Sequence, residues 1–327
     1  MYKVEVRSPV KNYSYLFVLA THLLHADGIE TDELDFPPVT NENFDDLVSD
    51  YNFVSEGLRF EFEGDYRYVG PARFKSDPIE GKHLDYQDAD ASIYFTQKIN
   101  CNNNLIWQLG LSYLHLGWKE NPRFSQEDFT NAIASLGYAT TSVENWRFVF
   151  NAGVTVDTKT FDFAQSGLYS GLIWGRYQYC QNLGLHVGVF GYVGIENGYT
   201  MPVAGVDWTI NPDWSLNLIF PFNISLEHKL GTRWSASMKY VGFGGPYRQP
   251  RRIDGGTGAF RDGIIEVFSK GVELDFSYRQ GAHLTAGFGA GWNGGGWILS
   301  KDRHNHHGKY FKFEGAPFGQ ANIDFGF

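Results

Sequence analysis

The chain has 327 residues and a formal net charge of −10, so it offers nucleic acid no basic surface. No stretch of about 18 consecutive apolar residues occurs, which excludes a protein that crosses a membrane with helices. Aromatic residues make up 17% of the chain and 38 residues are glycine, a combination that amphipathic strands with tight turns produce. Composition leaves a soluble sandwich, a lipocalin-like barrel and an outer-membrane barrel open.

The first 26 residues match a secretory signal peptide. Lys3, Arg7 and Lys11 precede an apolar run over 13–24, and the small residue Ala26 follows. A basic segment, an apolar segment of about a dozen residues and a small residue are the parts of such a peptide, and this run is too short to span a bilayer as a helix. We expect cleavage after Ala26; a first strand or a buried helix is the alternative.

An acidic segment comes next in the chain. Nine acidic residues and no Lys or Arg lie between Asp27 and Asp50. Charge of one sign is typical of a solvated, weakly ordered chain, so we expect residues 27–56 to lead into the folded domain. A Ca²⁺-binding or partner-docking role is the alternative.

Residues 57–327 have the pattern of β-strands. Apolar and polar residues alternate with period two in long runs, the clearest at 58–68, 105–113, 146–157, 233–240, 272–279 and 284–292. Many of these runs exceed the five or six residues usual in globular proteins and reach the roughly 9–11 residues that a tilted transmembrane strand needs. The length of the runs therefore favours a membrane barrel.

The connections between the runs alternate in size. Short connections fall at 101–104, 141–145, 181–184, 211–213, 230–232 and 280–281, and longer ones at 70–87, 119–130, 247–263 and 300–310. Outer-membrane barrels have short periplasmic turns and longer outer loops, so this asymmetry is a second indication of a membrane barrel.

Tryptophan placement gives a third indication. Four tryptophans lie near short turns and three lie about a strand-length away: Trp107, Trp146, Trp214 and Trp234, then Trp118, Trp292 and Trp297. This spacing predicts two aromatic belts, one at each membrane interface.

The chain ends in GQANIDFGF, where Ile323, Phe325 and Phe327 share one face of a predicted strand. This segment resembles the C-terminal assembly signal of Gram-negative outer-membrane proteins, in which a terminal aromatic residue ends an amphipathic strand. The resemblance implies a location in the bacterial outer membrane. It also implies recognition by the barrel-assembly machinery and contact with outer-membrane lipid and lipopolysaccharide. With the alternation, it predicts an all-β fold, a single closed antiparallel transmembrane β-barrel.

The segment Met201–Pro221, MPVAGVDWTINPDWSLNLIFP, lies within a longer resemblance that runs from Leu105 to the C-terminus. It is similar to an uncharacterised bacterial family of outer-membrane barrels, in which a turn with Pro and an aromatic residue precedes a strand ending in an apolar residue and Pro. That family implies no activity for residues of this chain.

The number of strands depends on residues 214–229. Alternation is unbroken from Trp214 to Leu226, as in one long strand. However, Pro221 cannot donate a ladder hydrogen bond, and both flanking connections have the character of periplasmic turns, which requires two short strands with a reversal at 220–223. We predict about 12 strands, with 14 as the alternative, since such barrels have an even number.

The face of the strands that would line the lumen carries charges of both signs: Arg59, Glu61, Glu63, Arg67, Arg147, Arg233, Lys239, Glu273, Asp275 and Arg279. One interpretation is that these residues pair and fill the lumen, because an isolated buried charge is costly. The other is a polar, porin-like pathway for small solutes with weak ion selectivity. We expect a channel or small-solute transporter; a structural or surface-interaction barrel with a plugged lumen is the alternative.

No residue pattern indicates catalysis, a cofactor or a metal site. His115 and His186 lie in predicted strands, but neither belongs to a nucleophile motif such as G-x-S-x-G, so an outer-membrane lipid-modifying enzyme is the least favoured hypothesis. His304, His306 and His307 cluster in the last long loop, where a solvated loop is expected and chelation of a transition metal is the alternative.

Two further groups of residues leave alternatives open. Arg248, Arg251 and Arg252 predict an ordinary exposed loop, or else one that contacts lipopolysaccharide phosphates. Cys101 and Cys180 fall at predicted periplasmic turns. An intramolecular disulfide, an intermolecular cross-link and two free thiols are all compatible with that oxidising compartment.

Overall fold

The computed structural model describes residues 58–75, 79–118, 127–159, 161–195, 198–248, 263–281, 283–302 and 308–326. The predicted signal peptide, the acidic lead-in, the histidines of the last loop, Arg251, Arg252 and Phe327 lie outside the described residues.

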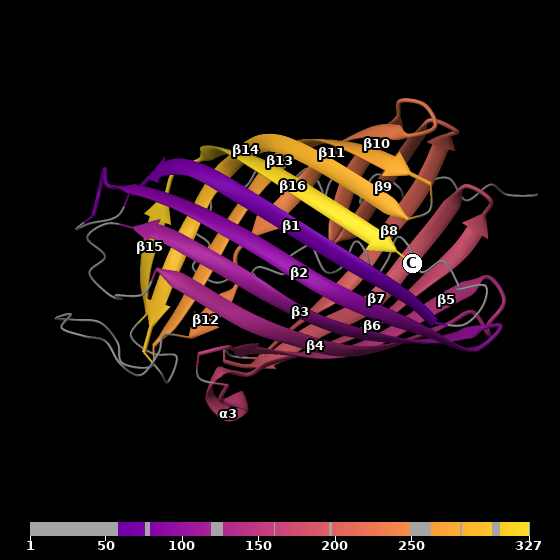
Figure 1. Ribbon diagram of the computed structural model, residues 1–327, viewed down its shortest axis with the longest axis horizontal. Coiled ribbons are helices and arrows are strands. Elements are labelled where there is room, and N and C mark those ends of the chain that lie inside the picture. The colour runs from indigo at the N-terminus through magenta and orange to yellow at the C-terminus, as the bar shows by residue number, and fades with distance from the viewer. Residues whose placement is uncertain are drawn as a thin grey trace, which may run out of the picture. The chain divides into compact units, whose positions relative to one another are not determined.

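Alternating residues form long antiparallel strands, which Figure 1 labels in chain order. The strands are β1 (Leu58–Arg73), β2 (His83–Asn100), β3 (Asn103–Trp118), β4 (Asp128–Thr140), β5 (Trp146–Asp157), β6 (Leu168–Cys180), β7 (Leu183–Gly194), β8 (Tyr199–Asn211), β9 (Trp214–Phe220), β10 (Asn223–Lys229), β11 (Trp234–Phe243), β12 (Pro246–Arg248), β13 (Ile264–Gln280), β14 (Leu284–Lys301), β15 (Lys309–Phe313) and β16 (Ala316–Gly326).

The sheet closes on itself, because β1 pairs with β16, β16 with β14, and β14 with β13. In the described part of the chain, 14 strands form the wall, namely β1 to β11, β13, β14 and β16. The short β12 continues β11 along β13, and β15 runs along β14 ahead of β16. The predicted closed antiparallel barrel is confirmed. The count of about 12 is two strands short, and the alternative of 14 is correct.

The chain reverses at Pro221 between two short strands. β9 and β10 pair as a hairpin in which Leu218 lies opposite Ile224, and the chain turns at Pro221 and Phe222. Paired residues are an even number of positions apart, so the apolar residues keep the same parity on both sides of the turn. Alternation therefore passes through the reversal unchanged, and only the proline marks it.

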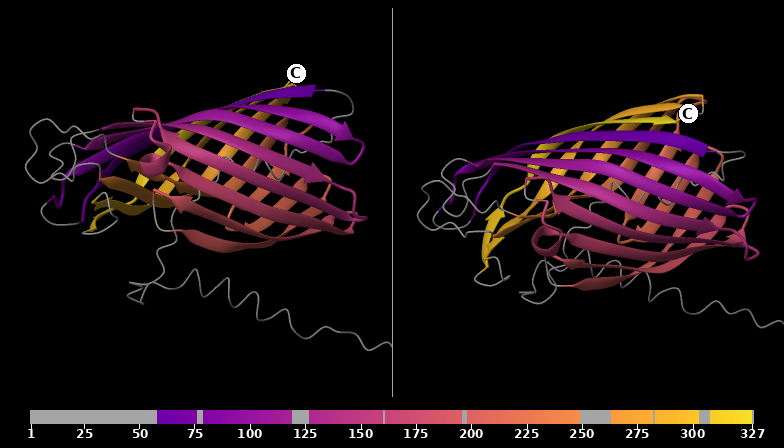
Figure 2. Two further views of the ribbon diagram at one scale, coloured as in Figure 1. Left: turned by 90° about the horizontal axis from the view of Figure 1, so that it is seen from below. Right: turned by 60° about the horizontal axis from the view of Figure 1, so that its bottom comes forward.

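The two ends of the barrel differ in their connections. At one end, the short-turn end, strands are joined through residues 101–102, 141–145, 181–182, 212–213, 230–233 and 281–283. The opposite end, the long-loop end, carries the longer connections, except for the turn at Pro221 and the brief connection 195–198 between β7 and β8. The predicted asymmetry is confirmed. Figure 2 shows the strands crossing the wall at a common tilt between these ends.

One short helix, α3 (Phe163–Ser166), belongs to the connection between β5 and β6 at the long-loop end. The Asp162 side chain accepts hydrogen bonds from the Ala164 and Gln165 amides at its N-terminus, as an N-cap does. Among the described residues, no helix has the length and apolar character needed to cross a membrane.

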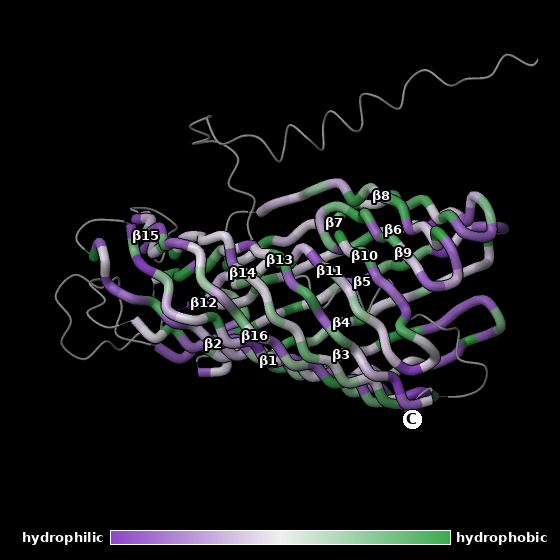
Figure 3. Tube along the Cα trace, turned by 90° about the horizontal axis from the view of Figure 1, so that it is seen from above, coloured by the Kyte–Doolittle hydropathy of each residue, from purple (hydrophilic) through white to green (hydrophobic). Residues whose placement is uncertain are grey.

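The outer face of the wall is apolar along the strands, and hydrophobic and hydrophilic residues alternate along the tube in Figure 3. On β3, Leu109 and Leu111 are exposed while their neighbour Gln108 is buried. Trp107, Trp214, Trp234 and Trp292 also point outward and are exposed. Trp118 does not: it is 2% exposed and points into the barrel, so its predicted place in a belt is wrong.

Trp118 points inward because the barrel is apolar inside at the long-loop end. A cluster of buried aromatic and aliphatic residues, the long-loop-end cluster, fills the space there. Trp118 packs against Phe74 and Phe311 with ring centroids 4.7 and 5.0 Å away, and Phe243 packs against Phe318 at 5.0 Å. Aromatic side chains bury large areas, so this end of the interior is packed like a soluble core.

Candidate functional site

Polar side chains meet in the middle of the barrel around Arg67 of β1, which is 2% exposed. Its guanidinium donates to Asp88 Oδ2 at 3.2 Å and, through Nε and Nη2, to Gln320 Oε1 at 3.0 and 2.8 Å. Gln320 in turn donates to Asp65 Oδ2 at 2.7 Å. The guanidinium also lies 4.5 Å from the ring centre of Phe243, in the geometry of a cation–π contact. The buried charge of Arg67 is therefore matched on several sides.

A cavity of about 200 Å³ lies between Arg67 and the strands β13, β14 and β16. Of the residues predicted to line the lumen, four surround it together: Glu63, Arg67, Lys239 and Glu273. Asp275, 2% exposed, lies beside this group, with its Oδ1 3.5 Å from Lys239 Nζ. A Cβ at Gly289 would collide with the Glu273 carboxylate, so the glycine makes room for this acidic side chain.

The other predicted lining residues lie elsewhere. Arg59 pairs with Glu61 at 3.1 Å near the start of β1. Arg147, on β5, is half-buried. Arg233 and Arg279 are exposed at the short-turn end, next to each other in the register, where the Arg279 amide donates to the Arg233 carbonyl at 2.7 Å. None of these residues lines this cavity or the second cavity, which lies along β3 to β7.

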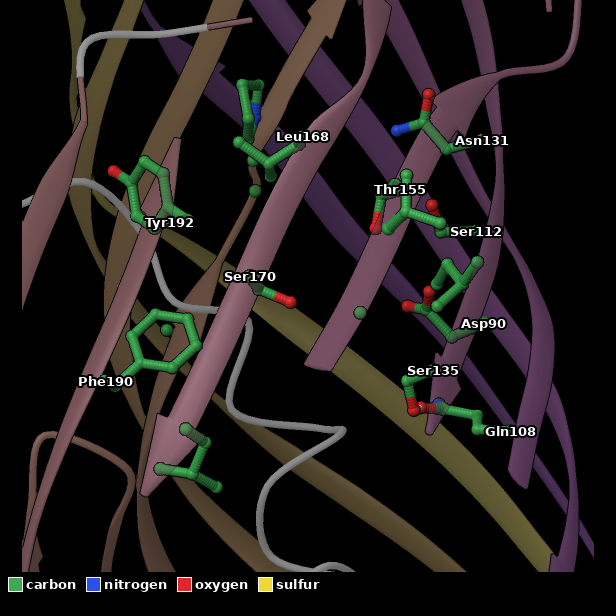
Figure 4. A pocket seen from close by; sticks show the side chains of 18 of the residues that line it. Asp90, Gln108, Ser112, Asn131, Ser135, Thr155, Leu168, Ser170, Phe190 and Tyr192 are labelled. Atoms are coloured by element: carbon green, nitrogen blue, oxygen red, sulfur yellow. The ribbon is translucent and has the colours of Figure 1, made fainter. Parts of the chain in front are cut away.

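A second cavity, of about 180 Å³, lies along β3 to β7. One wall is a ladder of neutral polar side chains, in which Gln108 bonds both Ser92 and Ser135, and Ser135 accepts from Asn151 at 3.2 Å. The other wall is apolar and includes Leu172, Phe190, Tyr192, Phe222 and Tyr247. Figure 4 shows Phe190 and Tyr192 on the side opposite Gln108, Ser112 and Asn131.

The two cavities adjoin, because Arg67, Asp90 and Gly242 line both of them. The interior is therefore hollow on both sides of Arg67, and the guanidinium lies where the two spaces meet. The polar and apolar side chains around these two cavities can bind and orient small polar or amphipathic molecules. The described residues contain no group of three His, Cys, Asp or Glu side chains able to hold a metal ion.

His186, one of the two strand histidines, belongs to a buried network near the short-turn end. Trp174 Nε1 donates to its Nδ1 at 3.1 Å, and its Nε2 lies 2.6 Å from Asp207, which also receives two bonds from Arg176. Both ring nitrogens are therefore engaged, and neither is placed to take a proton from a nucleophile. The network joins β6, β7 and β8.

His115, the other strand histidine, lies on the outer face near the long-loop end. Its Nδ1 is 2.8 Å from Asp128 Oδ1, and the Tyr113 hydroxyl donates to the same oxygen at 2.6 Å. This cluster is separated from the interior cavities by the wall.

The remaining sequence-predicted residues are placed as follows. Ile323 and Phe325 of the assembly signal point outward from β16 and are 44% and 43% exposed. Cys101 and Cys180 are both exposed and carry no disulfide. Arg248 is buried on β12, where an exposed loop was predicted, since it pairs with β13 in the wall.

Sequence reasoning missed the neutral ladder and the acidic partners of Arg67. Gln108, Ser135 and Asn151 come from three different strands, and no local pattern joins them. Asp88 does follow the parity of the inward face of β2, and that parity was the available signal. No sequence pattern marked the apolar wall of the cavity. Apolar residues at inward positions only interrupt the alternation of apolar and polar residues, and they do not show that the inner face is apolar there.

Fold and site together define a closed antiparallel barrel with an apolar exterior and a hollow, partly polar interior. No family model matches the chain. An uncharacterised protein of Chlamydia pneumoniae is 24% identical over 287 residues, which is 81% of this chain and 87% of that protein. An uncharacterised protein of Chlamydia trachomatis serovar D is 24% identical over 284 residues, with the same coverage of 81% and 87%.

Two solved structures are similar at low identity. The toluene transporter TodX of P. putida has a TM-score of 0.39 and 8% identity, over 84% of this chain and 90% of that one. A mutant of the Rh. blastica porin has a TM-score of 0.31 and 7% identity, over 83% of this chain and all (100%) of the porin.

Proposed function

We propose that the protein is a bacterial outer-membrane barrel that passes small solutes through its interior. The apolar outer face supports the membrane placement, since exposed residues such as Leu109, Leu111 and Leu274 would be covered by lipid. The short turns would face the periplasm and the long loops the outside. The bacterial relatives are consistent with this placement.

The observation that carries the transport proposal is the meeting of the two cavities at Arg67 and Asp90. A solute that moves between them must pass the guanidinium of Arg67. Because the cavities have volumes of only about 180 and 200 Å³, the pathway is suited to small molecules and not to a wide aqueous stream. Arg67 would then be a charged position that a solute meets in either cavity.

Electrical conductance across a planar bilayer tests this proposal. We expect the purified barrel to conduct weakly and the variant Arg67→Ala/Asp88→Ala to conduct more, because removing both members of the ion pair widens the junction without leaving either of them buried alone. Arg59→Ala is the matched control, since Arg59 lies on the same strand and face but lines neither cavity. Absence of conductance in both the native chain and the double variant would refute transport of ions.

Membrane placement has its own test. A closed barrel should resist detergent until it is heated, so boiled and unboiled samples should migrate differently in a gel. Identical migration of both samples, with solubility in the absence of detergent, would exclude the outer-membrane barrel.

A second function is favoured by the long-loop-end cluster. Trp118, Phe311 and Phe313 fill the interior at that end. A barrel closed there would serve as a structural or surface-interaction protein. It would stay silent in the conductance experiment while still migrating as a heat-modifiable barrel.

A further inference from the structure

The wall of the barrel is much lower at β9 and β10 than elsewhere. Each of these strands has 7 residues, whereas β8 has 13 and β14 has 18. Seven residues extend about 23 Å along a strand and rise about 18 Å at a tilt of ~40°, less than the apolar band of roughly 25 Å around such barrels. The hairpin therefore ends inside the thickness of a membrane.

The register locates the resulting gap. β8 pairs with β9 only up to Ala204, opposite Phe220, and β11 pairs with β10 only up to Tyr240, opposite Ile224. Beyond these pairs β8 continues beside β7, and β11 and β12 continue beside β13. At the usual strand spacing of ~4.8 Å, two missing strands leave the backbones of β8 and β11 about 14 Å apart.

The edge of β8 carries a proline at the position that faces the gap. The Thr209 amide donates to the carbonyl of Asn182, the residue just before β7. Because backbone groups alternate in direction along a strand, odd-numbered residues of β8 direct theirs to β7 and even-numbered residues direct theirs to β9. Pro202 is the first even-numbered residue beyond Ala204. It has no N–H group, so no donor is left unpaired at this point of the open edge.

The opposite edge also carries a proline, although Gly242 and Gly244, which lie nearer the hairpin on this edge, keep their N–H groups. The Gly245 carbonyl accepts from the Val267 amide of β13, so the next residue, Pro246, directs its backbone away from β13 and toward the gap. Prolines therefore occupy both open edges, where an unpaired N–H in hydrocarbon would be most costly. The carbonyls of the same residues remain as acceptors. Among the described residues, no strand pairs with either edge beyond the hairpin.

The cavity of about 180 Å³ lies directly behind the gap. Its lining includes residues from two borders of the gap, Phe222 at the tip of the hairpin and Gly245 and Tyr247 on the β11–β12 side, together with Tyr192 of β7, the strand next to β8. The far wall carries Gln108 and Ser135 of the neutral ladder, with Ser112 and Asn131 on the same side in Figure 4. An apolar cavity of about 150 Å³ holds a benzene molecule, so this space accepts a molecule of roughly six to ten non-hydrogen atoms.

We propose that the gap above the β9–β10 hairpin is a lateral opening through which a small, neutral, amphipathic molecule passes between the membrane and this cavity. The proposal rests on the outer-membrane placement proposed above. Phe190, Tyr192 and Phe222 would contact the apolar body of the molecule, and the amides and hydroxyls of the ladder would bond its polar group. A hydroxyl on the molecule would also find acceptors in the carbonyls of the open edges.

Quenching by brominated lipid tests the lateral opening. In a background with Cys101→Ser and Cys180→Ser, a bimane label is attached to one new cysteine at a time, and the barrel is reconstituted in vesicles whose acyl chains carry bromine. Met201→Cys reports on the gap, since Met201 is 3% exposed and points inward beside Pro202. Val149→Cys is the inward control on β5, and Val187→Cys is the outward reference.

We expect the bromine to quench the label at positions 187 and 201 and to leave the label at position 149 unquenched. If the label at 201 is quenched no more than the label at 149, the wall is closed and the lateral opening is wrong. If even the label at 187 is not quenched, the outer face does not contact lipid, and the membrane placement fails together with the opening. The two failures are therefore distinguishable.

Photolabelling tests the ligand class. An aliphatic alcohol that carries a diazirine is added to vesicles, and the labelled residues are mapped by mass spectrometry. We expect saturable labelling of Phe190, Tyr192 or Tyr247, and its loss in Gly245→Phe. Gly245 lines the cavity, and a Cβ there would meet only the Tyr247 side chain, at 3.9 Å. Gly319→Phe is the control, because a Cβ there meets only a carbonyl oxygen at 3.9 Å and Gly319 does not line the cavity.

Labelling confined to outward residues such as Val187, or cavity labelling that persists in Gly245→Phe, would overturn the assignment of the ligand class. Ser170→Leu fills the same cavity from β6 and replaces Gly245→Phe if that variant does not form a heat-modifiable barrel.

Discussion

Arg67 and Asp88 form an ion pair inside the barrel, with Nη1 of the arginine 3.2 Å from Oδ2 of the aspartate. The two residues lie opposite each other in the register of β1 and β2. Both are nearly excluded from solvent, with 2% and 8% of their surfaces exposed. The pair and its glutamine partner thereby join three strands, β16, β1 and β2, through their side chains.

Removal of one member of this pair should destabilise the barrel. We expect Asp88→Ala to lower the free energy of unfolding by about 3–5 kcal/mol, because the guanidinium then loses a buried counter-charge. The double variant Arg67→Ala/Asp88→Ala should lose less than Asp88→Ala alone. Urea unfolding in vesicles measures these values, and an equal loss in both variants would contradict the pairing.

The glycine at 289 leaves room for a carboxylate. A Cβ at Gly289 would overlap Glu273, so Gly289→Val should destabilise the barrel by about 1–3 kcal/mol through overpacking. Gly319→Val is the matched control on the neighbouring strand, because a Cβ there meets only a carbonyl oxygen at 3.9 Å. The temperature at which the heat-modifiable gel band is lost compares the two variants. An equal shift in both would rule out the steric explanation.

Phe222 and Phe220 lie at the same hairpin tip but on opposite faces. Phe222 is 1% exposed and packs edge-on against Phe190 with centroids 5.6 Å apart, whereas Phe220 is 45% exposed. We expect Phe222→Ala to cost about 3–5 kcal/mol, since it leaves an internal cavity. Phe220→Ala should cost less, because lipid fills the space. Urea titration distinguishes them, and the reverse order would place Phe220 inside.

Cys101 and Cys180 lie in or beside turns of the short-turn end and are exposed. In cells that express the barrel, a membrane-impermeant maleimide should modify them only after the outer membrane is permeabilised. Lys159→Cys, introduced at the opposite end in a background with both native cysteines replaced by serine, should react in intact cells. Labelling of the native cysteines from outside would reverse the orientation that we propose.

Most of the wall was predictable because each strand carries its own alternation. Pro221 marked the hairpin even though the parity of Trp214 to Leu226 continues through it, and the alternative of 14 strands follows from such reversals. The prediction failed where the environment of the inner face changes along one strand. Trp118 follows the inward parity of β3, yet its aromatic character suggested the outer face, and only the packing of Phe74 and Phe311 explains its direction.

The candidate site was predictable in its residue types but not in its assembly. Charges at inward positions such as Arg67, Lys239 and Glu273 could be selected from parity alone. Which of them meet depends on how the sheet closes, and this brings β1 beside β16 and β13 beside β14. Arg233 and Arg279 have the same parity as the cavity residues but lie too near the short turns to reach the cavities.

The seam between β1 and β16, seen side by side in Figure 1, has a consequence for synthesis. Asp65 and Gln320 bond across it although they are 255 positions apart in the chain. A ribosome therefore completes nearly the whole sheet before its first strand can find its last neighbour. During that interval both sheet edges and the apolar outer face are open to other chains. The incomplete barrel is therefore most prone to pair with another chain in the interval before its last strand arrives.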